Sequence, residues 1–119
     1  MTKASSVLIF AALFQMIPLA HATGTETGKA KFDYGQIFST PSHPGYTFFR
    51  LSEGTARTDR PGCATQDRWV INNAWPAAKT QIATLMSAVL VGRKVSVQGT
   101  GDCAAWGDTE TVWDVHLID

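Results

Sequence analysis

Two cysteines, Cys63 and Cys103, constrain this 119-residue chain more than any other feature. They follow an N-terminal segment that matches an export signal. Lys3 supplies a positive charge, residues 7–19 are almost wholly apolar, and residues 20–22 (Ala-His-Ala) have the small-x-small form of a cleavage site. Disulfides form and persist in exported proteins, and two cysteines have one way to pair. We therefore expect a Cys63–Cys103 disulfide in a secreted or periplasmic protein.

Cleavage after Ala22 would divide the chain into a signal peptide, residues 1–22, and a single domain, residues 23–119. The apolar run is interrupted by Gln15 and Pro18 and is too short to span a bilayer comfortably. We expect no membrane span after cleavage, although an uncleaved N-terminal anchor is the alternative. A core of this size is marginal, so closing the loop between the two cysteines would stabilise the domain.

The charge balance and the polar motifs exclude several classes of function. Ten Lys and Arg residues face ten Asp and Glu residues, so there is no basic surplus for nucleic acid. Two cysteines without histidine spacing do not predict a zinc site, and Asp102, Asp108 and Glu110 lack EF-hand spacing, which favours a solvated acidic loop. Residues 99–101 (Gly-Thr-Gly) lack a lysine and predict a turn. We expect no metal and no cofactor.

Five segments have the apolar alternation of strands and are separated by turn signals. A Thr/Gly-rich stretch, Thr23–Lys29, precedes them and is expected to be a loose arm. The first two strands should form a hairpin, and polar loops at 53–66 and 104–110 carry the next connections. The expected strands are Lys31–Ser39, Tyr46–Ser52, Arg68–Asn72, Val95–Gln98 and Thr111–Ile118.

One helix is expected between the third and fourth strands, because apolar residues recur there at helical spacing. Asn72 or Asn73 would cap its start, Pro76 would lie in its first turn, and Gly92 would end it. The fold class is therefore all-β with one helix, in the order β-β-β-α-β-β. That order is the connectivity of a small five-stranded OB-type barrel, here with one disulfide.

Four tryptophans occur in the expected domain. Trp69 and Trp113 alternate with aliphatic residues, which predicts that both are in the core, and Trp75 is suited to a hydrophobic staple at the helix start. Trp106 lies in a Gly/Ala/Asp loop without a periodic role. It could stack on the apolar face of a sugar, or it could cover the disulfide.

The segment from Trp69 through the helix to residues 92–97 (Gly-Arg-Lys-Val-Ser-Val) resembles the pentameric B subunits of subtilase cytotoxin and related pertussis-like toxins. The shared features are export, an early hairpin, a cysteine before the third strand, a central helix and a helix-Gly-x-x-Val entry to the fourth strand. The resemblance implies an OB fold, assembly into a cyclic pentamer, and binding of sialylated or other host glycans on the side of the barrel. In the first strand this chain has Asp33 and Tyr34, where that family has small polar residues.

We therefore expect an exported, non-enzymatic binding module similar to a toxin B subunit, with a glycan as ligand. The candidate ligand-contacting residues are Asp33, Tyr34, Tyr46, Gln98 and Trp106. One alternative is a periplasmic structural or interaction domain that binds a protein through its aromatic-rich hairpin. The other is a small hydrolase, because His116 and Asp114 lie two positions apart on one face of a strand, where a carboxylate could orient an imidazole.

Overall fold

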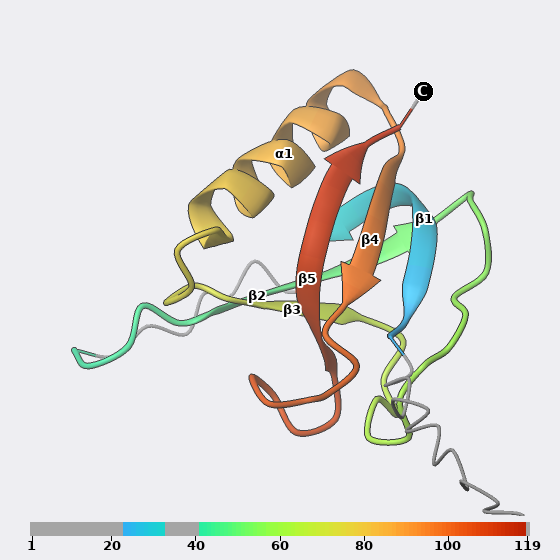
Figure 1. The fold of residues 1–119 in the computed structure, drawn as a ribbon. Helices are drawn as coiled ribbons and strands as arrows, with labels where there is room; N and C mark the ends of the chain where they lie inside the picture. Colours follow the sequence, from blue (N-terminus) through green and yellow to red (C-terminus); the bar gives the residue numbers. More distant parts are fainter. Residues whose placement is uncertain (1–22, 33–40, 119) are drawn as a thin grey trace, which may run out of the picture.

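The computed structural model describes residues 23–32 and 41–118; the expected signal peptide and the candidates Asp33 and Tyr34 lie outside them. Within these residues the chain forms five strands and one helix in the expected order β-β-β-α-β-β (Figure 1). The elements are β1 (Thr25–Phe32), β2 (Tyr46–Ser52), β3 (Trp69–Asn72), α1 (Ala78–Val91), β4 (Val95–Gly99) and β5 (Glu110–Leu117).

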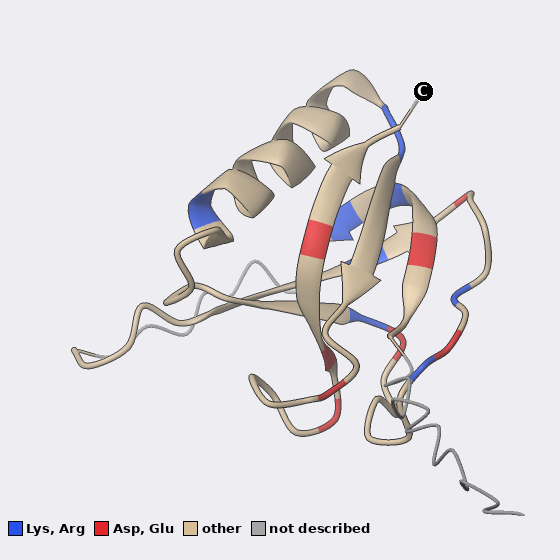
Figure 2. Cartoon of the chain, in the orientation of Figure 1, with Lys and Arg blue, Asp and Glu red and all other residues tan. Residues whose placement is uncertain are grey.

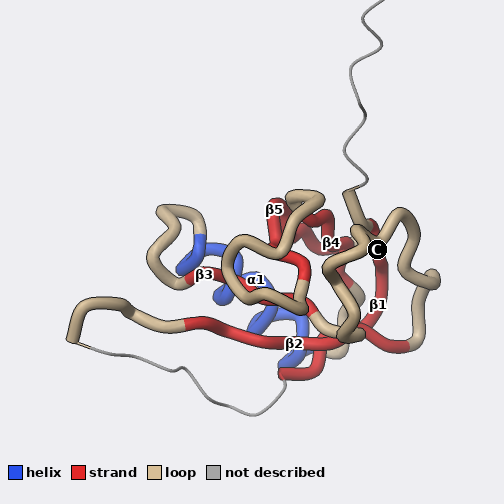
Figure 3. The backbone as a smooth tube through the Cα atoms, turned by 90° about the horizontal axis from the view of Figure 1, so that it is seen from below, coloured by secondary structure: helices blue, strands red, loops and turns tan. Residues whose placement is uncertain are grey.

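The five strands belong to one sheet whose pairings close on themselves in the order β1-β2-β3-β5-β4. The β3–β5 pair is parallel, and the pairs β1–β2, β2–β3, β4–β5 and β1–β4 are antiparallel. Figures 1 and 3 show β2 and β3 running across the direction of β4 and β5. Each strand therefore has a partner on both sides, which leaves few unpaired backbone edges.

The prediction of a loose arm at Thr23–Lys29 is wrong, because most of this stretch belongs to β1. Thr25–Gly28 pairs with β4, and Lys29–Phe32 pairs with β2. The change of partner falls at Gly28, where a Cβ atom would collide with the carbonyl oxygen of Ser52. A glycine is needed at this close approach, so one strand bends to serve both halves of the sheet.

The core forms between the sheet and one face of α1. Phe49, Trp69 and Ile71 from the sheet are buried against Leu85 and Ala88 of the helix. Three valines complete it from β4 and β5, namely Val95, Val97 and Val112. Helix–sheet burial of this kind is the main stabilising contribution in a domain of this size.

The helix ends as expected and starts later than expected. Gly92 adopts the left-handed conformation (φ 71°), and its N–H donates to the Ala88 carbonyl. The first helical residue is Ala78, after an Ala77 N-cap that makes no side-chain bond. The Asn72 side chain instead accepts from the Ala74 N–H at 3.0 Å, because a tight turn follows β3 before the helix can begin.

The disulfide is confirmed. Cys63 and Cys103 are bonded, with their Cα atoms 6.1 Å apart. Cys63 lies in the loop between β2 and β3, and Cys103 lies in the loop between β4 and β5. The bond thus joins two loops at the same end of the sheet.

Trp69 is fully buried, as expected, but the assignment of Trp113 to the core is wrong, because its exposed fraction is 61%. The cause is an irregularity in the β4–β5 ladder. Gln98 pairs with Asp114 and Gly99 pairs with Val112, so Trp113 has no partner opposite it. Such a bulge breaks the two-residue alternation and re-aims the side chain. Val112 therefore faces the core, and Trp113 faces solvent.

Candidate functional site

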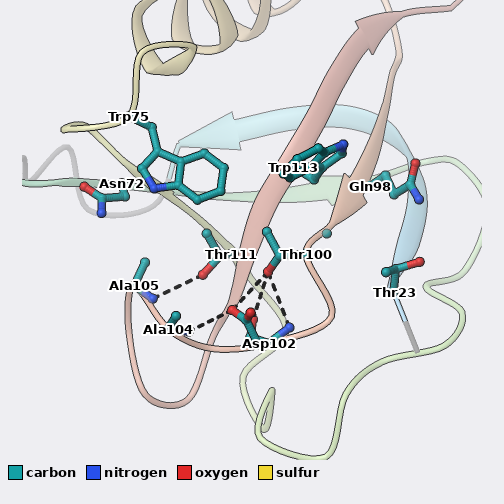
Figure 4. Close-up of a pocket in the computed structure, with 11 residues that line it drawn as sticks. Thr23, Asn72, Trp75, Gln98, Thr100, Asp102, Ala104, Ala105, Thr111 and Trp113 are labelled. Atoms are coloured by element: carbon teal, nitrogen blue, oxygen red, sulfur yellow. Dashed lines mark hydrogen bonds between the residues drawn. The ribbon is translucent and has the colours of Figure 1, made fainter. Parts of the chain in front are cut away.

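A pocket with a volume of about 540 Å³ opens where β3, β4 and β5 meet the turn before α1 (Figure 4). Its lining comes from five places: the segment before β1, the end of β3, the β3–α1 turn, the end of β4 with its following loop, and β5. The lining residues are Thr23, Asn72, Trp75, Gln98, Gly99, Thr100, Asp102, Ala104, Ala105, Thr111 and Trp113.

Two tryptophans provide the aromatic part of the lining. The rings of Trp75 and Trp113 meet edge to face, with centroids 6.1 Å apart and an interplanar angle of 89°. Trp75 lies in the turn before the helix, where its backbone N–H donates to the backbone carbonyl of Asn72 at 3.0 Å. The helix holds the backbone of Trp113, because the buried Gln81 amide donates to the Trp113 carbonyl at 2.9 Å. Gln81 is one of the buried residues of α1, so this bond is shielded from solvent.

The polar side of the pocket is a loop tied by its own hydrogen bonds (Figure 4). Asp102 Oδ1 accepts from the Thr100 hydroxyl at 3.1 Å and from the Ala104 N–H at 3.0 Å. The backbone of Thr111 bonds to that of Thr100 and Asp102, and its hydroxyl accepts from the Ala105 N–H at 3.2 Å. These hydrogen bonds hold the loop against β5.

A buried ion pair lies beneath this loop. Glu110, fully buried, accepts from Arg57 Nη2 at 2.8 Å and from the N–H groups of Gly24 and Gly101 at 2.9 and 3.1 Å. The Arg57 guanidinium also lies 3.8 Å from the centre of the Trp69 ring. The expectation that Glu110 belongs to a solvated acidic loop is therefore wrong. Its carboxylate fixes backbone on both sides of the pocket, beside Thr23 and beside Thr100 and Asp102.

The candidate contacts predicted from sequence fall in different places. Gln98 lines the pocket. Tyr46 and Trp106 lie together elsewhere, with ring centroids 5.4 Å apart, and Trp106 also packs edge-on against Phe48 at 5.2 Å. The Trp106 ring thus covers residues of β2.

The His116 and Asp114 side chains form the expected pair, with Nδ1 and Oδ2 2.8 Å apart. Both side chains are about half exposed, at 59% and 48%, and neither lines the pocket. Among residues 23–32 and 41–118 there is no group of three His, Cys, Asp or Glu side chains that could hold a metal ion. In the same part of the chain, no helix is long and apolar enough to cross a membrane.

Sequence reasoning missed most of this site. Trp75 and Trp113 were assigned to a staple and to the core, while Thr23 was assigned to a loose arm. A tryptophan before a proline in a turn after β3 was the available signal for Trp75. The exposure of Trp113 depends on the β5 bulge, for which the sequence carries no local signal.

Comparison of the chain with family models, with curated proteins and with solved structures finds no match. The resemblance to toxin B subunits therefore stays a prediction.

Proposed function

We propose that this chain is an exported, non-enzymatic binding module that holds a saccharide in the Trp75–Trp113 pocket. The observation that carries the proposal is the composition of the lining. Two indole rings border a rim of hydroxyl and amide side chains from Thr23, Asn72 and Gln98. Indole faces and edges suit the C–H surfaces of a sugar, and fixed polar groups suit its hydroxyls.

The proposed fold is an OB-type barrel. A closed strand order of β1-β2-β3-β5-β4, with the helix between β3 and β4, supports it. OB-type barrels bind oligosaccharides and oligonucleotides with their strands and with the loop between the last two strands. That loop supplies Asp102, Ala104 and Ala105 here. The disulfide supports export, because such bonds persist in oxidising compartments.

Binding is favoured over hydrolysis by the number of ionisable groups in the pocket. Among the residues that the structure describes, Asp102 is the single ionisable side chain of the lining. Hydrolysis of a glycosidic bond ordinarily needs two carboxyl groups, one on each side of the bond. One carboxylate can orient a sugar, but it cannot act as both the acid and the nucleophile or base. The exposed His116–Asp114 pair lies outside the pocket.

The assembly state is part of the proposal. Self-association, as the toxin resemblance implies, is supported by apolar side chains that α1 exposes: Met86 (52%), Leu90 (83%) and Val91 (68%). A mass measurement in solution tests it.

The competing proposal is a protein ligand bound by the aromatic-rich segment around Tyr46, Phe48 and Trp106. A protein captured from envelope extract and not released by free sugar would favour that reading.

The test is a glycan array with oxidised residues 23–119, followed by titration calorimetry with the best sugar. Trp113→Ala should weaken binding by about tenfold or more with little loss of stability, because the side chain is largely exposed. Trp106→Ala is the matched control, since it removes a partly exposed tryptophan outside the pocket and should leave sugar affinity unchanged. A wild-type protein that binds no sugar, or a Trp113→Ala variant with wild-type affinity, would refute the proposal.

A further inference from the structure

The charge of the pocket restricts the class of saccharide, provided that the proposed function holds. Within residues 23–32 and 41–118, the lining contains one carboxylate, Asp102, and no lysine, arginine or histidine. Figure 2 shows acidic segments in the loop between β4 and β5 that carries Asp102. The first turn of the neighbouring helix carries a basic residue, Lys79, which is exposed and does not line the pocket.

Asp102 is placed to accept a hydrogen bond from a ligand. Its two side-chain bonds, from Thr100 and Ala104, both go to Oδ1. Oδ2 has no bonded partner among the described residues, so it is available to a hydroxyl group. A hydroxyl that donates to a carboxylate forms a charge-assisted bond, which is about twice as strong as a bond between neutral groups.

The remaining polar groups of the lining are neutral and suit the same kind of ligand. The Asn72 amide uses its oxygen for the Ala74 N–H, which leaves its NH₂ group as a donor. The indole N–H groups of Trp75 and Trp113 have no acceptor among the described residues, so they too can donate. Such donors can meet sugar oxygens, but they carry no positive charge to offset a ligand carboxylate beside Asp102.

We infer that this pocket selects uncharged saccharides and discriminates against saccharides that carry a carboxylate, sialylated glycans included. The inference therefore excludes the sialylated glycans that are among the ligands implied by the toxin resemblance. Asp102 would bind a hydroxyl of the neutral sugar and would repel an acidic one. At the few-ångström separations inside a pocket, repulsion between two partly hydrated carboxylates corresponds to about a tenfold loss of affinity.

The experiment compares matched pairs of ligands: a panel of neutral oligosaccharides and the same oligosaccharides carrying a terminal sialic acid. We expect wild-type protein to bind at least one neutral member and to bind its sialylated form about tenfold more weakly at low salt. Raising the ionic strength from about 0.01 M to about 1 M should narrow the difference, because the screening length falls from about 30 Å to about 3 Å. This salt series needs no variant.

Two substitutions complete the design. Asp102→Asn should weaken neutral-sugar binding several-fold and reduce the discrimination, with a thermal scan to check that the loop stays folded. Lys79→Gln should change neither affinity. Equal or tighter binding of the sialylated forms would overturn the inference and leave the proposed function intact. If Lys79→Gln then lost its binding of the sialylated forms, Lys79 would be the cation that attracts the sialic acid. Failure to bind any member of either panel would instead refute the proposed function.

Discussion

Glu110→Gln is the substitution that most directly tests how the pocket is supported. The change keeps the shape of the side chain and one acceptor oxygen for the Gly24 and Gly101 N–H groups, but it removes the charge opposite Arg57. The two side chains of this pair are 3% and 0% exposed. The variant would therefore bury an arginine without its counter-ion.

The magnitude follows from that burial. Removing one partner of a buried ion pair lowers the free energy of unfolding by about 3–5 kcal/mol. We expect a loss near the lower end, about 3 kcal/mol, because glutamine keeps one acceptor oxygen for the glycine N–H groups. A domain of this size has a total stability of about 5–15 kcal/mol, and each kcal/mol lowers its melting temperature by about 4–8 °C. We expect a melting temperature lower by roughly 12–24 °C, and weaker sugar binding because both glycines flank pocket residues.

Urea unfolding of the oxidised domain is the assay, with free energies extrapolated to water and compared at equal m-values. Glu53→Gln is the matched control, since it removes a carboxylate from an exposed pair with Lys29 and should leave the midpoint essentially unchanged. Adding Arg57→Met to Glu110→Gln should recover part of the loss, because no unpaired charge then remains. A Glu110→Gln variant within about 0.5 kcal/mol of wild type, a difference typical of a surface change, would refute the reasoning.

Two further predictions concern the disulfide and a half-buried carboxylate. Cys63→Ser should lower the free energy of unfolding by up to about 4 kcal/mol, because the disulfide joins residues 40 positions apart. It should also weaken sugar binding, since Cys103 lies between Asp102 and Ala104 of the pocket, and an unchanged urea midpoint would contradict the stability prediction. Burial raises the pKa of Glu26 above its ordinary 4.5, although the bond from Trp69 Nε1 opposes the shift. The folded state therefore binds more protons, so stability should fall as pH rises from 4.5 through the raised pKa. Glu26→Gln should flatten that slope in urea titrations at several pH values; the same slope in the variant would show that another group causes it.

Much of the fold could be predicted because its signals are local. The helix face, Gly92 at the helix end and the aromatic-rich sequence of β2 each depend on a few neighbouring residues. The cysteine pairing followed from there being two cysteines. The extent of β1 could not be predicted, since Thr25–Gly28 is a strand only because β4 lies beside it. Its Thr- and Gly-rich sequence has little strand signal of its own.

The pocket was harder to predict because its residues depend on tertiary contacts. Gln98 was among the predicted ligand-contacting residues, and it does line the pocket. Trp113 was assigned to the core because strict alternation from Val115 and Leu117 would have buried it. The bulge opposite Gln98 and Gly99 shifts the phase of the strand by one residue. Departures from regular pattern in natural proteins concentrate at functional or strained sites, and this one exposes an indole at the pocket.

Three features of this domain act on the same few segments of backbone. Glu110 holds Gly24 and Gly101, the buried Gln81 holds the carbonyl of the bulged Trp113, and the disulfide fixes Cys103 within the pocket loop. A small domain selected for stability alone could replace a buried ion pair and a buried amide with apolar side chains at little or no cost. Each of these groups instead sets the position of a pocket wall. Together these groups hold the pocket in one shape, as the proposed binding of a rigid, hydroxyl-bearing ligand would require.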